Sequence, residues 1–193
     1  MVYYRVLKVI LHIACWLPLI YLIYAVNHRL LGADPQEEML HQLGLWTLIF
    51  LLGGLSITPL NRIFKFPVLV KYRRILGLYA FFYLILHITT FFIFFLENSI
   101  SYLWDEIIER PYITVGMLAT LMLLPLVFTS TRKMQRKLGR NWKRIHKLVY
   151  PIAILGITHF IWQSKSDLNE PLLYLIWLVS ILGFRLYYFK FKN

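Results

Sequence analysis

The chain has 193 residues, of which 59% are hydrophobic and only 16% are charged. A soluble domain carries about 25% charged residues, so the composition excludes a soluble globular protein, and lipid must solvate much of the apolar surface. The formal net charge of +12 would suit nucleic acid, but the positions of the charges indicate a membrane topology instead.

Six apolar runs follow one another along the chain, and each is long enough to cross a bilayer as a helix. The first exceeds the roughly 7–15 apolar residues of a cleaved signal peptide, so we interpret it as a retained span. No internal sequence repeat is visible. We predict an all-α integral membrane protein, a six-transmembrane-helix bundle forming a single domain over residues 1–193, with spans at about 6–26, 41–60, 75–96, 112–130, 145–162 and 172–188.

Charged residues are divided between the two sides that these spans define. All nine acids fall on one side, together with Arg29, Arg110 and Lys165. The other basic residues, including Lys192, fall on the side of the two chain ends. The positive-inside rule therefore places both termini in the cytoplasm of a multi-pass protein of the bacterial inner (cytoplasmic) membrane. Anionic head groups of the lipid bilayer are the expected partners of the basic side, and nucleic acid is not.

Two histidines inside the predicted spans lie at the same depth. His87 is thirteen residues past Arg74 and His159 is twelve past Lys147, which places them roughly 20 Å and 18 Å from the basic side. Ionisable residues inside a membrane are costly and mark functional sites. Two imidazoles at one level on antiparallel helices predict one heme iron with two axial ligands. Because Cys15 is the single cysteine, a CxxCH attachment is excluded and the heme is expected to be b-type.

His146 lies at the basic boundary, thirteen residues before His159. On an ideal helix this spacing leaves the two side chains about 140° apart, although Pro151 and Gly156 between them can distort the helix. His146 can bind a second iron with another partner, face a heme carboxylate, serve a flavin or quinone site, or simply be solvated. Three histidines near the membrane margins receive no role: His12, His28 and His41.

Several motifs occur in order along the chain: LGADP (31–35), ITPLNR (57–62), RRILGLYAFFYLILHITTF (73–91), RPYITVG (110–116), FTSTRKMQRKLGRNWKRIHKLVYPIAIL (128–155) and THFIW (158–162). With these motifs the chain resembles the MsrQ (YedZ) family over nearly its whole length. That family comprises the heme-binding membrane subunits of the bacterial MsrPQ methionine sulfoxide reductase system. It belongs with the ferric reductase-like transmembrane domains, relatives of the NADPH oxidase membrane core.

The resemblance implies a subunit that passes electrons through b-type heme to a periplasmic molybdopterin-containing methionine sulfoxide reductase, which supports repair of oxidised periplasmic proteins. The implied electron donor is the quinone pool or a cytoplasmic flavin reductase, and FMN is a further implied cofactor. The heme histidines of the family match His87, His146 and His159. No residue is matched to a catalytic role, so the chain is expected to be an electron-transfer subunit of an oxidoreductase system.

The chain departs from the wider oxidase pattern in its third span. That pattern has two histidines on each of two helices, thirteen or fourteen residues apart, which bind two stacked hemes. His146 and His159 satisfy it, but the positions thirteen and fourteen residues before His87 hold Arg74 and Arg73. We assign both arginines to cofactor binding, predict one heme, and leave a second heme open.

Two other functions remain open from the residues alone. No G-x-G-x-x-G motif precedes a predicted helix and the spans occupy most of the chain, so we expect electron relay without a soluble FAD/NADPH domain. The alternatives are a stand-alone transmembrane metal (ferric) reductase and a non-redox small polytopic transporter or scaffold. Transporters typically contain repeats or broken helices at mid-membrane, and Gly53-Gly54 is a weak sign of one.

The acidic side is the expected exit for electrons. Complementary charge mainly raises the rate at which two proteins meet, so we expect a periplasmic partner with a basic patch. The loop with Asp105, Glu106 and Glu109 is the predicted docking surface, and the stretch 34–38 is the alternative.

Overall fold

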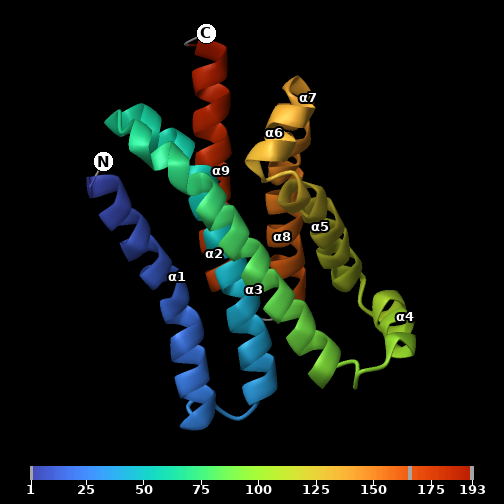
Figure 1. Ribbon diagram of the computed structural model, residues 1–193. Coiled ribbons are helices and arrows are strands. Elements are labelled where there is room, and N and C mark those ends of the chain that lie inside the picture. The colour runs from blue at the N-terminus through green and yellow to red at the C-terminus, as the bar shows by residue number, and fades with distance from the viewer. Residues whose placement is uncertain (1, 165–166, 192–193) are drawn as a thin grey trace.

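The computed structural model describes residues 2–164 and 167–191, so Lys165 and Lys192 lie outside the part discussed below. The described residues form helices joined by short loops (Figure 1). In chain order these are α1 (Val2–Asn27), α2 (Pro35–Phe64), η1 (Pro67–Tyr72), α3 (Arg73–Phe94), α4 (Ile100–Glu109), α5 (Pro111–Phe128), α6 (Arg132–Leu138), α7 (Arg140–Ile145), η2 (His146–Leu148), α8 (Val149–Gln163) and α9 (Asn169–Phe191).

Six helical segments among the described residues are long and apolar enough to cross a membrane, as predicted. The main difference in bounds is at α2, which begins at Pro35 rather than near residue 41. Asp34 caps this helix, since its Oδ1 accepts hydrogen bonds from the backbone N–H groups of Gln36 and Glu37, and a proline suits the first helical position. These polar residues extend the helix beyond its apolar part, which hydropathy alone does not detect.

Two segments expected to be loops contain helices. Residues 97–110 include α4, whose apolar residues recur at helical spacing although the helix is too short to span. Residues 132–144 contain α6 and α7, which meet at Gly139 with a φ of +51° that favours glycine. The fifth span is also interrupted, because the 3₁₀ turn η2 precedes α8. Each residue of a 3₁₀ turn rotates the chain further about the helix axis than a residue of an α-helix does. The turn therefore brings the side chains of His146 and His159 closer to the same face of the helix.

α2 is the central helix of the bundle. It packs extensively against α3 and also contacts α1, α8 and α9, while α5 packs mainly against α8. Leu52 of α2, Ala80 of α3 and Ala153 of α8 are fully buried at these crossings. The outer helix faces carry exposed apolar side chains, such as Leu17 and Val179, which is the arrangement expected of a lipid-facing surface.

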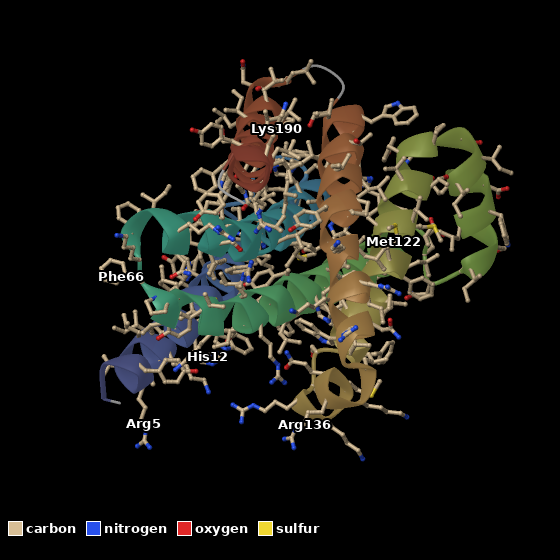
Figure 2. All side chains as sticks on the ribbon, turned by 90° about the horizontal axis from the view of Figure 1, so that it is seen from above. Arg5, His12, Phe66, Met122, Arg136 and Lys190 are labelled. Carbon is tan, nitrogen blue, oxygen red and sulfur yellow. The ribbon has the colours of Figure 1, made fainter. Side chains whose placement is uncertain are left out.

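The two ends of the bundle differ in charge, and we call them the basic end and the acidic end. Both chain ends lie at the basic end with α6 and α7, whereas α4 and the α1–α2 loop lie at the other (Figure 1). Seen from the basic end, Arg5 and Arg136 lie at the periphery of the bundle (Figure 2). This agrees with the alternation of charge that the sequence predicts.

A tyrosine of α3 is inserted into the backbone of α1. The Tyr83 hydroxyl donates to the Cys15 carbonyl at 2.8 Å and accepts from the Leu19 N–H at 3.1 Å. In an uninterrupted helix that N–H would bond directly to Cys15. Pro18 lies at this point and interrupts the regular ladder. The Tyr83 side chain, only 1% exposed, thereby joins α1 to the bundle.

We expect Tyr83→Phe to lower stability by about 1–3 kcal/mol, because it leaves a buried N–H and a buried carbonyl without partners. The measurement is the unfolding temperature of the detergent-solubilised protein. Tyr21→Phe is the matched control, since Tyr21 lies on α1 but is 62% exposed. Equal stability of the two variants would show that the α1 backbone closes its own hydrogen bond when the hydroxyl is absent.

Candidate functional site

His87 lies on α3 and is held by the backbone of α2. Its Nδ1 is 2.9 Å from the carbonyl oxygen of Leu40. A carbonyl can only accept, so Nδ1 carries the proton and Nε2 keeps its lone pair. Gly44, one turn further along α2, leaves room for the ring, because a Cβ there would lie 3.0 Å from Cε1 of His87 and 3.1 Å from Nδ1.

His159 of α8 is held by α5 in the same way. Its Nδ1 donates to the carbonyl oxygen of Tyr112 at 2.7 Å, and a Cβ on Gly116 would lie 2.9 Å from Nδ1 and 3.0 Å from Cε1. In both cases 47 residues separate the carbonyl from its histidine. The helix pairs α2–α3 and α5–α8 therefore repeat one arrangement, although no repeat is visible in the sequence.

The two histidine rings are neighbours inside the bundle. Their centres are 6.4 Å apart and their planes are perpendicular, at 90°. Two imidazoles on opposite sides of one metal ion have ring centres roughly 6 Å apart, because each metal–nitrogen bond is about 2 Å long. With both Nδ1 atoms occupied by carbonyls, the nitrogen available on each ring is Nε2.

These residues fit a heme iron. Imidazole is a usual axial ligand of heme iron, and iron-binding histidines commonly donate their other N–H to a backbone carbonyl, which fixes the tautomer and raises ligand basicity. Within residues 2–164 and 167–191, no three His, Cys, Asp or Glu side chains converge as a metal site. A histidine pair suits heme because the porphyrin supplies the remaining ligands.

His146 has different surroundings. Its Nε2 is 3.1 Å from the Thr129 hydroxyl oxygen, and its ring stacks on Trp142 with centres 4.0 Å apart. The Thr129 hydroxyl itself donates to the carbonyl of Pro125 at 2.6 Å, so Nε2 of His146 is the donor of their shared bond. His146 thus has other partners than the neighbouring rings of His87 and His159.

The two arginines assigned to cofactor binding point in different directions. Arg74 is exposed at the start of α3, whereas Arg73 is partly buried and donates through Nη2 to the hydroxyl of Thr58 on α2. Only Arg73 therefore turns toward other helices of the bundle.

Each remaining histidine has a nearby partner. Nδ1 of His12 lies 2.8 Å from the Tyr79 hydroxyl, and the ring of His28 packs on Tyr24 with centres 4.2 Å apart. Nε2 of His41 lies 3.1 Å from a carboxylate oxygen of Glu170.

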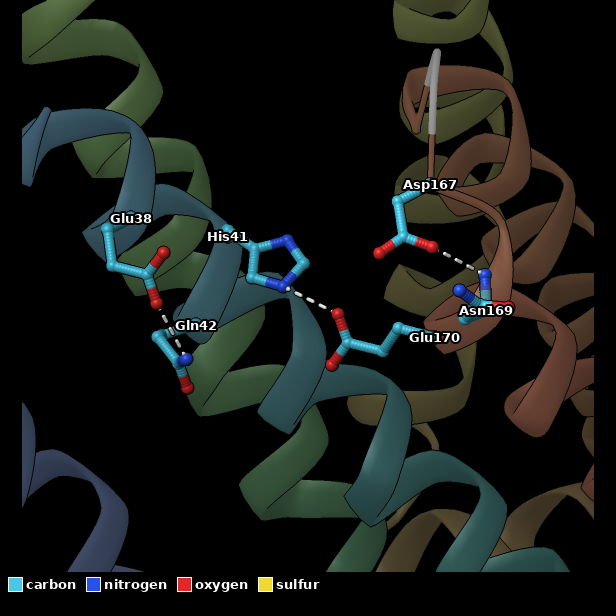
Figure 3. Close-up of polar contacts among 6 residues, drawn as sticks. All are labelled: Glu38, His41, Gln42, Asp167, Asn169 and Glu170. Atoms are coloured by element: carbon cyan, nitrogen blue, oxygen red, sulfur yellow. Dashed lines mark hydrogen bonds and ion pairs between the residues drawn. The ribbon is translucent and has the colours of Figure 1, made fainter.

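His41 also lines an open pocket at the acidic end. Figure 3 shows His41 of α2 pointing toward Glu170 at the start of α9, with the Glu38–Gln42 bond on the same helix. The pocket has a volume of about 400 Å³ and is lined by Leu31, Ala33, Asp34, Glu37, Glu38, His41 and Gln163. His41 follows Leu40 in sequence and packs against Phe160, which follows His159. Through His41, the pocket is thus connected to residues next to both histidines of the pair.

Sequence reasoning missed the residues that hold the two rings. The carbonyls of Leu40 and Tyr112 are backbone groups, so no pattern of side chains identifies them. Gly44 and Gly116 occur in apolar runs, where a glycine can have several structural roles. Their equal spacing from the histidines was the available signal, but it becomes meaningful only once α2 is known to pair with α3 and α5 with α8.

Known proteins are similar to this chain over much of its length. Residues 39–157 match the family described as ferric reductase like transmembrane component. A protein-methionine-sulfoxide reductase heme-binding subunit MsrQ from Xanthomonas oryzae pv. oryzae (strain MAFF 311018) is 44% identical over 186 residues, which cover 93% of this chain and 85% of the relative. The protein of the same description from Xanthomonas euvesicatoria pv. vesicatoria (strain 85-10) is 48% identical over 157 residues, covering 81% and 72%. No solved structure matches.

The matched residues define the chain as a ferric reductase-like transmembrane protein; they include α3 with His87 and end two residues before His159 of α8. The chain belongs to this family and, within it, to the MsrQ subunits of protein-methionine-sulfoxide reductase.

Substitution of the two packing glycines tests the site. We expect Gly44→Ala and Gly116→Ala each to displace a histidine ring, because the added methyl would lie within about 3 Å of it. The expected result is a several-fold lower ratio of heme to protein, or a changed low-spin absorption spectrum. Gly77→Ala is the control, since a Cβ on Gly77 meets nothing within 4 Å. Normal spectra for both test variants would contradict the assignment.

Proposed function

We propose that the chain binds one b-type heme between His87 and His159 and relays electrons across the membrane. The observation that carries the proposal is the pair of rings 6.4 Å apart, each with Nδ1 donating to a helix carbonyl. Both available nitrogens are then Nε2 atoms, as two axial ligands require. The MsrQ relatives are described as heme-binding subunits, which supports heme as the cofactor.

The protein's contribution is ligation and orientation. The Leu40 and Tyr112 carbonyls hold each neutral imidazole in the tautomer with the proton on Nδ1, so the Nε2 lone pair of each ring is available to a metal. When bound, heme iron supplies the one-electron redox chemistry. Helices α2, α3, α5 and α8 exclude water from the site and thereby set the polarity of its surroundings.

We further propose the direction and the partners of electron transfer. The basic end faces the cytoplasm of the inner membrane, as the positive-inside rule indicates, and electrons enter there from quinone or a cytoplasmic flavin reductase. They leave at the acidic end to a periplasmic molybdopterin-containing methionine sulfoxide reductase. His146 and Arg73, near the basic end, serve electron entry or a second cofactor such as heme or FMN. Arg74 is assigned to the same cofactor region.

Histidine substitution is the direct test of ligation. We expect His87→Ala or His159→Ala to abolish the low-spin heme spectrum and electron transfer, because each removes one axial bond. His146→Ala should keep that heme and slow reduction from the basic side, since its Nε2 is engaged by Thr129. The measurements are visible spectra of purified protein and the rate of heme reduction. Heme loss in His146→Ala alone would mean that the pairing is wrong.

Two acidic surfaces are available to the partner. Asp105 and Glu109 are exposed on α4, whereas Glu37 and Glu38 line the pocket beside His41. His41 lines the pocket, follows Leu40 in sequence and packs against Phe160, and a short path from the histidine pair favours electron exit there. We therefore propose that the partner docks over the pocket rather than over α4.

Two charge-matched double variants distinguish these surfaces. We expect Glu37→Gln/Glu38→Gln to slow reoxidation of the reduced heme by a methionine sulfoxide reductase partner, with a loss that shrinks as salt rises, because salt screens exposed charges over about 8 Å. Asp105→Asn/Glu109→Gln removes the same charge from α4 and should have the smaller effect. Asp34 is left intact because it caps α2. The opposite ranking of rates at low salt would assign docking to α4.

A further inference from the structure

The short helix α4 carries a row of exposed apolar side chains at the acidic end. Ile100, Trp104 and Ile108 follow one another at intervals of four residues, so they lie along one face of the helix. Their side chains are 68%, 67% and 75% exposed, and no described residue covers them. We call these three residues the apolar ridge. Exposed apolar rows of this kind mark contacts with a protein, a ligand or a membrane.

The other faces of α4 have different surroundings. Leu103 and Ile107, also four residues apart, are half-buried, and α4 packs mainly against α5, so these two residues face the bundle. Asp105 and Glu109 are exposed and form an acidic face. At about 100° per residue, the apolar ridge lies between the packed face and the acidic face. The helix is thus amphipathic beyond what its packing on α5 requires.

Both ends of α4 are tied to membrane helices. α3 ends at Phe94, and the turn that follows is closed by the Asn98 N–H, which donates to the Phe92 carbonyl at 3.1 Å. Arg110 alone separates the end of α4 from the start of α5. Figure 1 shows α4 outside the bundle, beside α5. A helix of this length spans only about 15 Å, so these two connections keep it at the margin of the membrane.

The membrane helices next to the apolar ridge expose apolar side chains to lipid. Ile93 and Phe94 are exposed in the last turn of α3, and Leu118 and Leu121 are exposed on α5. The ridge therefore continues a lipid-facing surface toward the acidic end. Tryptophan is enriched at the level of the lipid head groups. An amphipathic helix at this level buries its apolar face at the boundary of head groups and acyl chains and keeps its charged face in water.

We propose that α4 is an interfacial helix whose apolar ridge inserts among the lipids of the leaflet at the acidic end. Asp105 and Glu109 then point to water, where their carboxylates stay solvated. The first turn of α5 directly follows this anchor and carries the Tyr112 carbonyl that holds His159. The lipid contact is argued from α4 and its neighbours, so it depends neither on heme nor on the proposed docking surface.

Spin labels on single cysteines measure where each face of α4 lies. Cys15→Ala removes the single native cysteine. A cysteine is then introduced on the ridge as Ile100→Cys, or on the acidic face as Asp105→Cys, the matched control about 140° away around the same helix. Leu121→Cys on α5, where the native side chain is 59% exposed, is the reference for lipid.

Each labelled protein is reconstituted in vesicles of phosphatidylethanolamine and phosphatidylglycerol. Electron paramagnetic resonance then measures collisions of the label with oxygen, which concentrates in lipid, and with a nickel chelate, which stays in water. The ratio of oxygen to nickel collisions should be several-fold higher for Ile100→Cys than for Asp105→Cys, and should approach the ratio for Leu121→Cys. Ile108→Cys repeats the measurement at the other end of the ridge and replaces Ile100→Cys if that variant fails to fold.

Equal ratios for the ridge and the acidic face would overturn the inference, because the ridge would then lie in water. Protection of the ridge label from both reagents would also overturn it, since protein, including a second copy of this chain, would then cover the ridge. A ridge label that meets water until a methionine sulfoxide reductase partner is added would assign the ridge to protein docking, which contradicts the lipid contact as well.

Discussion

The hydrogen bond between an imidazole N–H and a helix carbonyl is the interaction on which the site depends. A carbonyl inside a helix is normally covered by side chains of the next turn, so a ring can reach Leu40 or Tyr112 only where that turn carries glycine. The same bond leaves Nε2 free on both rings. Close packing of α2 on α3 and of α5 on α8 is therefore a condition for ligand geometry as well as for stability.

Prolines in the membrane helices also leave backbone groups available to side chains of other helices. Pro18 interrupts α1 where the Tyr83 hydroxyl is inserted, and Pro59 leaves the Leu55 carbonyl available to Arg185. In a bilayer no water can satisfy such exposed groups. Partners from other helices must do so, which links the peripheral helices α1 and α9 to the central pair and orients the groups that they carry.

The acidic end and the basic end of the bundle hold different groups. The histidine pair adjoins the acidic end through His41 and Phe160, whereas His146 and the two arginines that donate to Thr58, Arg73 and Arg185, belong to the basic end. The proposed electron relay needs separate points of entry and exit, and this division is consistent with it.

The sequence by itself determined the six spans, the separation of charge and the shared depth of His87 and His159. Hydropathy, charge and helical rise are properties of each residue and do not depend on its tertiary contacts. It missed α4 and the early start of α2, since short or polar helical turns carry no span signal. Only the tertiary structure decided which carbonyls hold the rings, that Arg73 rather than Arg74 turns inward, and that Arg185 joins it. Those facts depend on helix rotation and pairing, which arise from packing between segments distant in sequence.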